Sequence, residues 1–127
     1  MNAEQRIMRD ILIMSMEDDD RARWEGKITA DNVDDVWDEF SDCVWDCIYD
    51  FRCGDVETDI ECDWSRHYES KSVASKLSDG TWVGWTYWYG GGKHGDPEGI
   101  PWLDEAYELD VTEEEKLVTI RTFKKRD

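Results

Sequence analysis

Hydrophobic side chains near the start of the chain recur at the three-to-four-residue spacing of a helix. One face of this segment collects Ile7, Met8, Ile11, Leu12 and Ser15. The spacing predicts an amphipathic helix over residues 2–16. The acidic run at 17–20 is expected to end this helix, and residues 24–30, with a glycine at 26, are expected to form a connection.

A second helical pattern begins at Thr29 or Asp31, either of which can cap a helix, and runs to about Phe51, with Gly54 just beyond. At 100° per residue, its apolar side chains share an arc of about 120°. They are Val33, Val36, Trp37, Phe40, Val44, Cys47, Ile48 and Phe51. The opposite arc, about 160° wide, is acidic. It contains Asp31, Asp34, Asp35, Asp38, Glu39, Asp42, Asp46 and Asp50. The pattern predicts one continuous helix with a buried face and an acidic face.

From Asp55 the period changes to two, which predicts a half-buried strand with a row of carboxylates facing the solvent. The carboxylates are Asp55, Glu57, Asp59, Glu61 and Asp63, and they alternate with Val56, Thr58, Ile60, Cys62 and Trp64. Residues 68–77 and 81–89 are predicted to form a hairpin with its turn at 78–80. The second of these strands has bulky residues on both faces, which is typical of an interior strand.

Residues 90–101 are rich in glycine and proline and are expected to form a loop. A last hairpin is predicted from 108–111 and 117–123, joined by 112–116. Two helices followed by about five antiparallel strands indicate an α+β fold, with both helices packed on one face of the sheet. The chain is expected to be one domain over 1–127. It contains no recognisable leader or membrane segment, so we expect a cytoplasmic protein.

The charge balance narrows the function. The chain carries 32 acidic and 15 basic side chains, for a net charge of -17. Nucleic acid and anionic lipid would be repelled by such a surface. The eight Trp, five Tyr and three Phe argue against an acidic disordered chain. Residues 31–63 contain thirteen acidic side chains and a single basic one, Arg52, so this quarter of the chain carries -12 of the total.

The acidic side chains are regularly spaced. Asp34, Asp38, Asp42, Asp46 and Asp50 would rise about 6 Å per step along a helix, and the strand carboxylates would lie about 6.6 Å apart. Phosphates along a DNA backbone are separated by roughly twice their 3.4 Å axial rise. Six like-charge pairs four residues apart cost the helix about 1–3 kcal/mol together. The alternatives are a surface that only keeps the protein soluble, and adaptation to high salt.

Trp45 and Tyr49 lie inside the acidic arc, one helical turn apart. Trp and Tyr are enriched at the energetic centres of protein interfaces, and carboxylates around them would steer a basic partner. The alternative is that another element, such as the first helix, covers both rings.

Other candidate chemistries find weaker support. The spacing of Cys43, Cys47, Cys53 and Cys62 differs from paired zinc motifs, and Cys47 and Cys62 are predicted to be small core residues. Without a leader, reduced thiols are expected. The run Gly90–Gly95 departs from the phosphate-loop pattern, since Lys93 is followed by a histidine. We predict no catalytic residue, metal or cofactor.

In charge, size and the pattern of residues 31–63, the chain resembles the acidic DNA-mimic inhibitors of phages and mobile elements. That resemblance implies an inhibitor that occupies a basic nucleic-acid-binding surface of a partner protein, such as a restriction, CRISPR or repair enzyme. The predicted partner-binding residues are Asp34, Asp38, Asp42, Trp45, Asp46, Tyr49, Asp50, Asp55, Glu57, Asp59, Glu61 and Asp63. One alternative is an immunity protein that neutralises a cognate toxin, such as a basic nuclease, through Trp45 and Tyr49. Another is a ligand-binding or enzymatic domain that uses the Trp-rich sheet. The sequence leaves the oligomeric state open.

Overall fold

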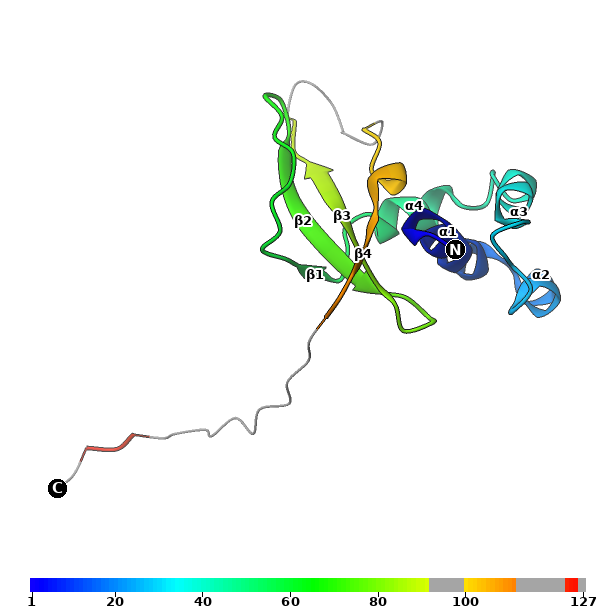
Figure 1. Cartoon of the computed structure of the whole chain (residues 1–127), viewed down its shortest axis with the longest axis horizontal. Helices are drawn as coiled ribbons and strands as arrows, with labels where there is room; N and C mark the ends of the chain where they lie inside the picture. The colour runs from blue at the N-terminus through cyan, green and yellow to red at the C-terminus, as the bar shows by residue number, and fades with distance from the viewer. Residues whose placement is uncertain (92–99, 112–122, 126–127) are drawn as a thin grey trace.

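The computed structural model describes residues 1–91, 100–111 and 123–125. The helices are α1 (Ala3–Ser15), α2 (Asp18–Trp24), α3 (Val33–Glu39), α4 (Trp45–Phe51) and the short 3-10 helix η3 (Leu103–Glu105). The strands are β1 (Val56–Glu57), β2 (Glu69–Lys76), β3 (Trp82–Tyr89) and β4 (Tyr107–Leu109). They form one antiparallel sheet in the order β1-β2-β3-β4, and the four α-helices lie to one side of it (Figure 1). The predicted α+β arrangement is confirmed, with four strands among the described residues rather than about five.

The first predicted helix is confirmed as α1. Its start is fixed by a capping box: the Asn2 side chain accepts from the backbone N–H of Gln5, and the Gln5 side chain accepts from the backbone N–H of Asn2. These two bonds satisfy N–H groups that a helix start otherwise leaves unpaired. Ile7, Ile11 and Leu12 are completely buried, so the apolar face forms part of the core.

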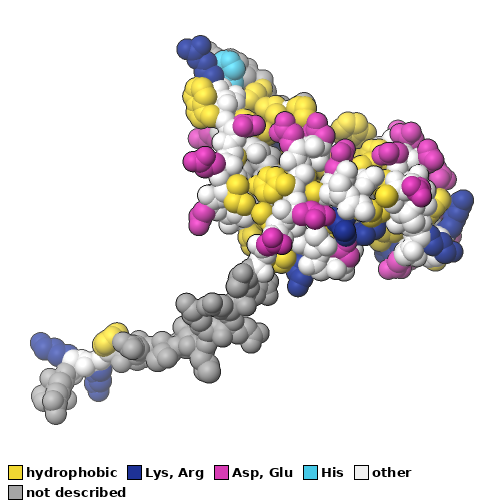
Figure 2. Space-filling view, viewed as in Figure 1, with side chains coloured by type: hydrophobic (Ala, Val, Ile, Leu, Met, Phe, Trp, Pro, Cys, Tyr) yellow, Lys and Arg dark blue, Asp and Glu magenta, His cyan; other side chains and the backbone are white. Residues whose placement is uncertain are grey.

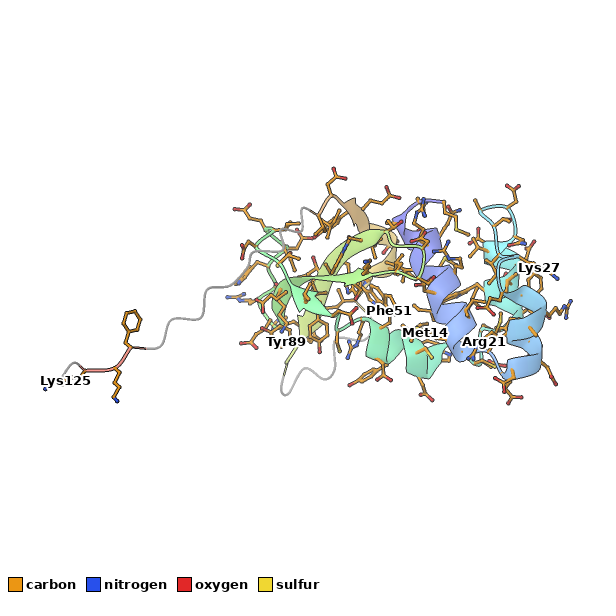
Figure 3. The ribbon with its side chains drawn as sticks, turned by 90° about the horizontal axis from the view of Figure 1, so that it is seen from below. Met14, Arg21, Lys27, Phe51, Tyr89 and Lys125 are labelled. Carbon is orange, nitrogen blue, oxygen red and sulfur yellow. The ribbon has the colours of Figure 1, made fainter. Side chains whose placement is uncertain are left out.

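The acidic run at 17–20 begins a helix, contrary to the expectation that it would only end one. Asp18, Asp19 and Asp20 occupy the first turn of α2, where negative charge is favoured by the helix dipole. Arg21 of α2 then donates to the carbonyls of Ile13 and Met16, both at 3.1 Å. Figure 3 shows Arg21 beside the end of α1, so this side chain ties the two helices together.

The predicted continuous helix over 29–51 is wrong, because residues 40–44 form turns that separate α3 from α4. A straight helix would repeat like charges every four residues, with no basic side chain to relieve them. The break falls where Asp42 would otherwise face both Asp38 and Asp46. Ser41 and Asp42 are also weak helix formers.

The apolar arc of this segment nevertheless faces the core, as predicted. Val33, Val36 and Val44 are buried. Trp37, Phe40, Cys47, Ile48 and Phe51 are partly buried against the same core cluster. The turn therefore changes the direction of the chain while keeping the buried side of both short helices on α1 and the sheet.

The predicted hairpin is confirmed. β2 and β3 pair along their full length from Glu69↔Tyr89 to Lys76↔Trp82. Gly80, with φ +87°, supplies the left-handed residue of the turn, and the backbone N–H of Leu77 donates to the carbonyl of Thr81 across it. β3 also pairs with β4, so it is an interior strand.

The predicted strand over 55–63 is largely wrong, because only Val56 and Glu57 pair as β1. Beyond Thr58, serine hydroxyls of β2 replace the backbone ladder. Ser72 donates to the carbonyl of Ile60 at 2.6 Å and Ser70 to the carbonyl of Asp63 at 2.6 Å. This edge lies at the opposite side of the sheet from β4, the strand that α1 contacts. Its alternate apolar residues are therefore not covered: Val56, Ile60 and Trp64 are exposed.

The core joins the helices to the sheet through Trp85 of β3. Its ring is fully buried between Phe51 of α4 and Trp102, with ring centroids 5.5 and 5.2 Å away. Figure 3 shows Phe51 at the end of α4 that meets the sheet. The Trp85 indole N–H donates to the carbonyl of Arg52 at 2.8 Å. This bond fixes the position of the C-terminal end of α4 on the sheet.

The other predicted features divide between confirmed and untested. The first strand of the last hairpin is present as β4, whereas most of its second strand, 117–123, lies outside the described residues. Most of the glycine-rich loop, residues 92–99, also lies outside them. In the part of the chain that the structure describes, no helix has the length and apolar character needed to cross a membrane.

Candidate partner-binding surface

Every residue predicted to bind a partner is exposed to solvent. The helical ones are Asp34, Asp38, Asp42, Trp45, Asp46, Tyr49 and Asp50, and the sheet-edge ones are Asp55, Glu57, Asp59, Glu61 and Asp63. Figure 2 shows acidic side chains distributed across the whole visible face of the described domain, not gathered in one file.

The break in the helix divides these residues among three places. α3 lies at the end of the domain farthest from the sheet edge, and the segment that follows β1 lies at the other end (Figure 1). α4 lies between them, next to the sheet. The regular spacing of one long helix is thus lost, and phosphate-like intervals remain only within each short helix, as between Asp34 and Asp38 or Asp46 and Asp50.

The carboxylates of 31–63 are hardly neutralised by the rest of the chain. Among ion pairs between described residues, one involves this region, between Lys71 and Glu57 at 4.0 Å. The arginines of α1 and α2 pair with acids outside it: Arg6 with Asp79 and Glu108, Arg9 with Asp10 and Asp79, and Arg21 with Asp18. The negative potential of 31–63 is therefore directed into solvent.

The aromatic pair on α4 is the most distinctive part of this surface. Trp45 is 70 % exposed and Tyr49 is 45 % exposed, so the alternative that α1 covers both rings is wrong. Beside them is a pocket of about 250 Å³. Its lining comprises Trp45, Asp46, Ile48, Tyr49, Arg52 and Trp102.

Arg52 anchors this pocket from below. It is only 7 % exposed, and its guanidinium lies 4.3 Å from the Tyr49 ring centroid and 5.7 Å from that of Tyr87. Both contacts are within the range of cation–π attraction. A hydrogen bond with Cys53 and burial raise the pKa of Tyr87 above its ordinary value, so this phenol stays neutral. Tyr49 is therefore held in place although its outer side faces water.

Sequence reasoning missed three residues of this pocket as site residues: Ile48, Arg52 and Trp102. Ile48 was assigned to the buried arc, and Trp102 is distant in sequence. Arg52 could have been noticed, because it is the single basic side chain in the acidic region and lies three residues after Tyr49. That spacing places the two side chains on the same helical face.

A second hollow, of about 460 Å³, lies at the sheet edge around Trp64. Trp64 is 82 % exposed, and Arg66, Tyr68 and Tyr89 line the same hollow. The predicted outward row of carboxylates thus lies beside exposed apolar side chains as well.

The cysteines are free thiols in this structure. Cys47 is half-buried against the core, as predicted, and Cys62 is half-buried with its Sγ 3.7 Å from the Ser70 hydroxyl. Cys43 and Cys53 are exposed. Among the described residues there is no group of three or more potential metal ligands.

The Trp-rich strand contributes mainly to packing. Trp85 is completely buried and Trp88 nearly so. Known proteins offer no functional guide beyond this geometry, since the chain matches no protein-family model, no curated protein and no solved structure.

Proposed function

We propose that this chain is an acidic binding protein that occupies a basic nucleic-acid-binding surface on a partner protein and thereby inhibits it. The observation that carries the proposal is the exposure of all the predicted carboxylates between Asp34 and Asp63, with Glu57 alone ion-paired to another described residue. Unscreened carboxylates on a protein of net charge -17 attract a basic surface over a long range and raise its association rate.

The proposal does not need a regular phosphate-like row. Three separate acidic segments present charge over most of the length of the domain, and electrostatic competition with a polynucleotide depends on total charge and reach more than on exact spacing. The acids also come at a cost to folding, since like charges four residues apart destabilise short helices. A binding function accounts for that cost better than solubility does.

The second candidate, an immunity protein against a basic toxin, is favoured by the exposed Trp45 and Tyr49. In such a complex a few aromatic residues contribute most of the affinity. Trp45→Ala would then weaken binding more than the loss of any single carboxylate.

The test is a comparison of three forms of the chain against the basic protein that each captures from a lysate of its native host. In the first variant Asp38, Asp42 and Asp46 are changed to Asn. The matched control removes the same charge elsewhere, with Asp104→Asn, Glu105→Gln and Asp110→Asn, three exposed positions outside 31–63.

We expect the first variant to bind its partner at least about tenfold more weakly at low salt, and the control to bind nearly as well as the unmodified chain. Added salt should weaken the unmodified complex more steeply than that of the first variant. Equal affinities for the first variant and the control would show that the position of the acids is irrelevant, and would overturn the proposal.

A further inference from the structure

We propose that the pocket on α4 receives one arginine side chain of the partner, whose guanidinium stacks on the Trp45 ring and pairs with the Asp46 carboxylate. This inference rests on the proposed function and adds to it the chemistry of the contact. It follows from the size of the pocket, the position of its charges and the aromatic contacts that the chain itself makes.

The size of the pocket fits a side chain. Its volume of about 250 Å³ is smaller than the roughly 300–1,000 Å³ of sites that hold drug-sized ligands. The walls include the apolar Ile48 and the nearly buried Trp102. An extended aliphatic stem can lie along such walls while its polar head stays near water.

The charges select a cation and set its depth. Asp46 is exposed and therefore lies at the rim, whereas Arg52 is almost fully buried and forms the base. Asp42 and Asp50 flank Asp46 in sequence at intervals of four residues and are also exposed. An anion would have to approach through the -12 charge of residues 31–63, and a cation driven to the base would meet the Arg52 guanidinium. The favourable position is a positive head group at the rim and an apolar stem below it.

The exposed aromatic ring favours arginine over lysine. A planar guanidinium stacks on an aromatic face and binds a carboxylate at the same time, whereas an ammonium group is a compact and strongly hydrated charge. The chain already uses this contact twice: Arg52 lies 4.3 Å from the Tyr49 ring centroid, and Arg23 lies 5.2 Å from that of Trp24. Trp45 offers the same kind of surface to solvent.

The test is an NMR titration of the ¹⁵N-labelled full chain with N-acetyl-arginine amide, with N-acetyl-citrulline amide as the neutral isostere. The Trp45→Phe variant identifies the Trp45 indole N–H signal. The internal reference is the indole signal of Trp64, which is equally accessible but lies on the sheet edge.

We expect the arginine probe to move the Trp45 signal saturably at millimolar concentration, and to bind about tenfold more tightly than the citrulline probe. Asp46→Asn should remove that preference, and the matched Asp104→Asn should keep it. Equal binding of the two probes, an equal shift at Trp64, an unaffected Trp45 signal or an Asp46→Asn variant with its preference intact would each overturn the inference.

The outcome is separable from that of the proposed function. If the captured partner binds Trp45→Ala as tightly as it binds the unmodified chain, but loses affinity when Asp38, Asp42 and Asp46 are neutralised, the arginine pocket is refuted and the acidic inhibitor is not. If the charge variants have no effect while the arginine titration succeeds, the pocket stands and the proposed function fails.

Discussion

The indole ring of Trp85 connects the sheet to the helix that presents the candidate pocket, and Trp85→Phe tests that connection. The substitution removes the indole N–H, so the buried carbonyl of Arg52 loses its donor at 2.8 Å. An unsatisfied buried acceptor costs about 1–3 kcal/mol. The smaller phenyl ring also leaves space between Phe51 and Trp102, which adds about 1–2 kcal/mol.

The two effects together should lower the free energy of unfolding by about 2–4 kcal/mol, a large part of the roughly 5–15 kcal/mol that holds a domain of this size folded. Urea unfolding followed by far-UV circular dichroism measures the change directly. With a slope of about 1–3 kcal/mol per molar urea, we expect the midpoint to fall by about 1–2 M.

The matched control for Trp85→Phe is Trp64→Phe, the same substitution at a ring that is 82 % exposed. It should change the unfolding free energy by no more than about 0.5 kcal/mol. A loss below about 1 kcal/mol for Trp85→Phe, or equal losses for both variants, would refute the role assigned to Trp85 in holding α4 on the sheet.

Three further perturbations test separate parts of the fold. Burial alone would raise the pKa of Asp79, but hydrogen bonds from Thr81, Arg9 and Arg6 hold it well below its ordinary value of 3.8. Its ionised form therefore stabilises the fold above about pH 4, and the stability gap between the unmodified chain and Asp79→Asn in thermal melts should narrow as the pH falls below that value; a gap that widens in acid would contradict this. Gly54→Ala should cost about 1–3 kcal/mol more than Gly26→Ala in urea unfolding, because both glycines have positive φ but only at Gly54 would the new Cβ lie 2.6 Å from a Val73 carbon; equal costs would mean that close packing at β2 is unimportant. Ser72→Ala removes the donor to the Ile60 carbonyl, so limited proteolysis should cut within 58–63 faster than in the exposed control Ser78→Ala, unless the hydroxyl does not hold this segment.

Local patterns predicted the elements whose partners are close in sequence. The three-to-four spacing of Ile7, Ile11 and Leu12 was sufficient for α1, because a single buried face defines an amphipathic helix. The turn around Gly80 and the flanking β-formers were sufficient for the hairpin, whose register follows from its turn. The capping pair Asn2 and Gln5 is a further local signal that would have sharpened the helix start.

The errors arose where charge and tertiary context competed with periodicity. The apolar arc from Val33 to Phe51 is continuous on a helical wheel, yet the wheel does not include the repulsion that a break at Asp42 relieves. The alternation after Asp55 predicts a strand only if some layer covers Val56 and Ile60, and the position of the helices over the other side of the sheet is not encoded in that segment. The acidic run at 17–20 was open to two interpretations, since negative charge suits a helix start as well as a solvated loop.

The candidate site was predictable in its exposed residues and not in its shape. The wheel placed Trp45 and Tyr49 opposite the apolar arc, and both are exposed. The pocket beside them also needs Trp102, which reaches α4 only through the packing of Trp85. Contacts between residues so far apart in sequence depend on the whole fold.

The central claim is that the acidic surface and a nucleic acid compete for the same basic surface. The most direct measurement is fluorescence anisotropy of a labelled DNA duplex bound to the captured partner, followed as the chain is added at fixed salt. We expect the anisotropy to fall to that of the free duplex at a chain concentration near the dissociation constant of the complex, and the variant with Asp38, Asp42 and Asp46 changed to Asn to require at least about tenfold more protein. A rise in anisotropy, which would report a ternary complex, or an unchanged value at saturating chain would contradict the claim.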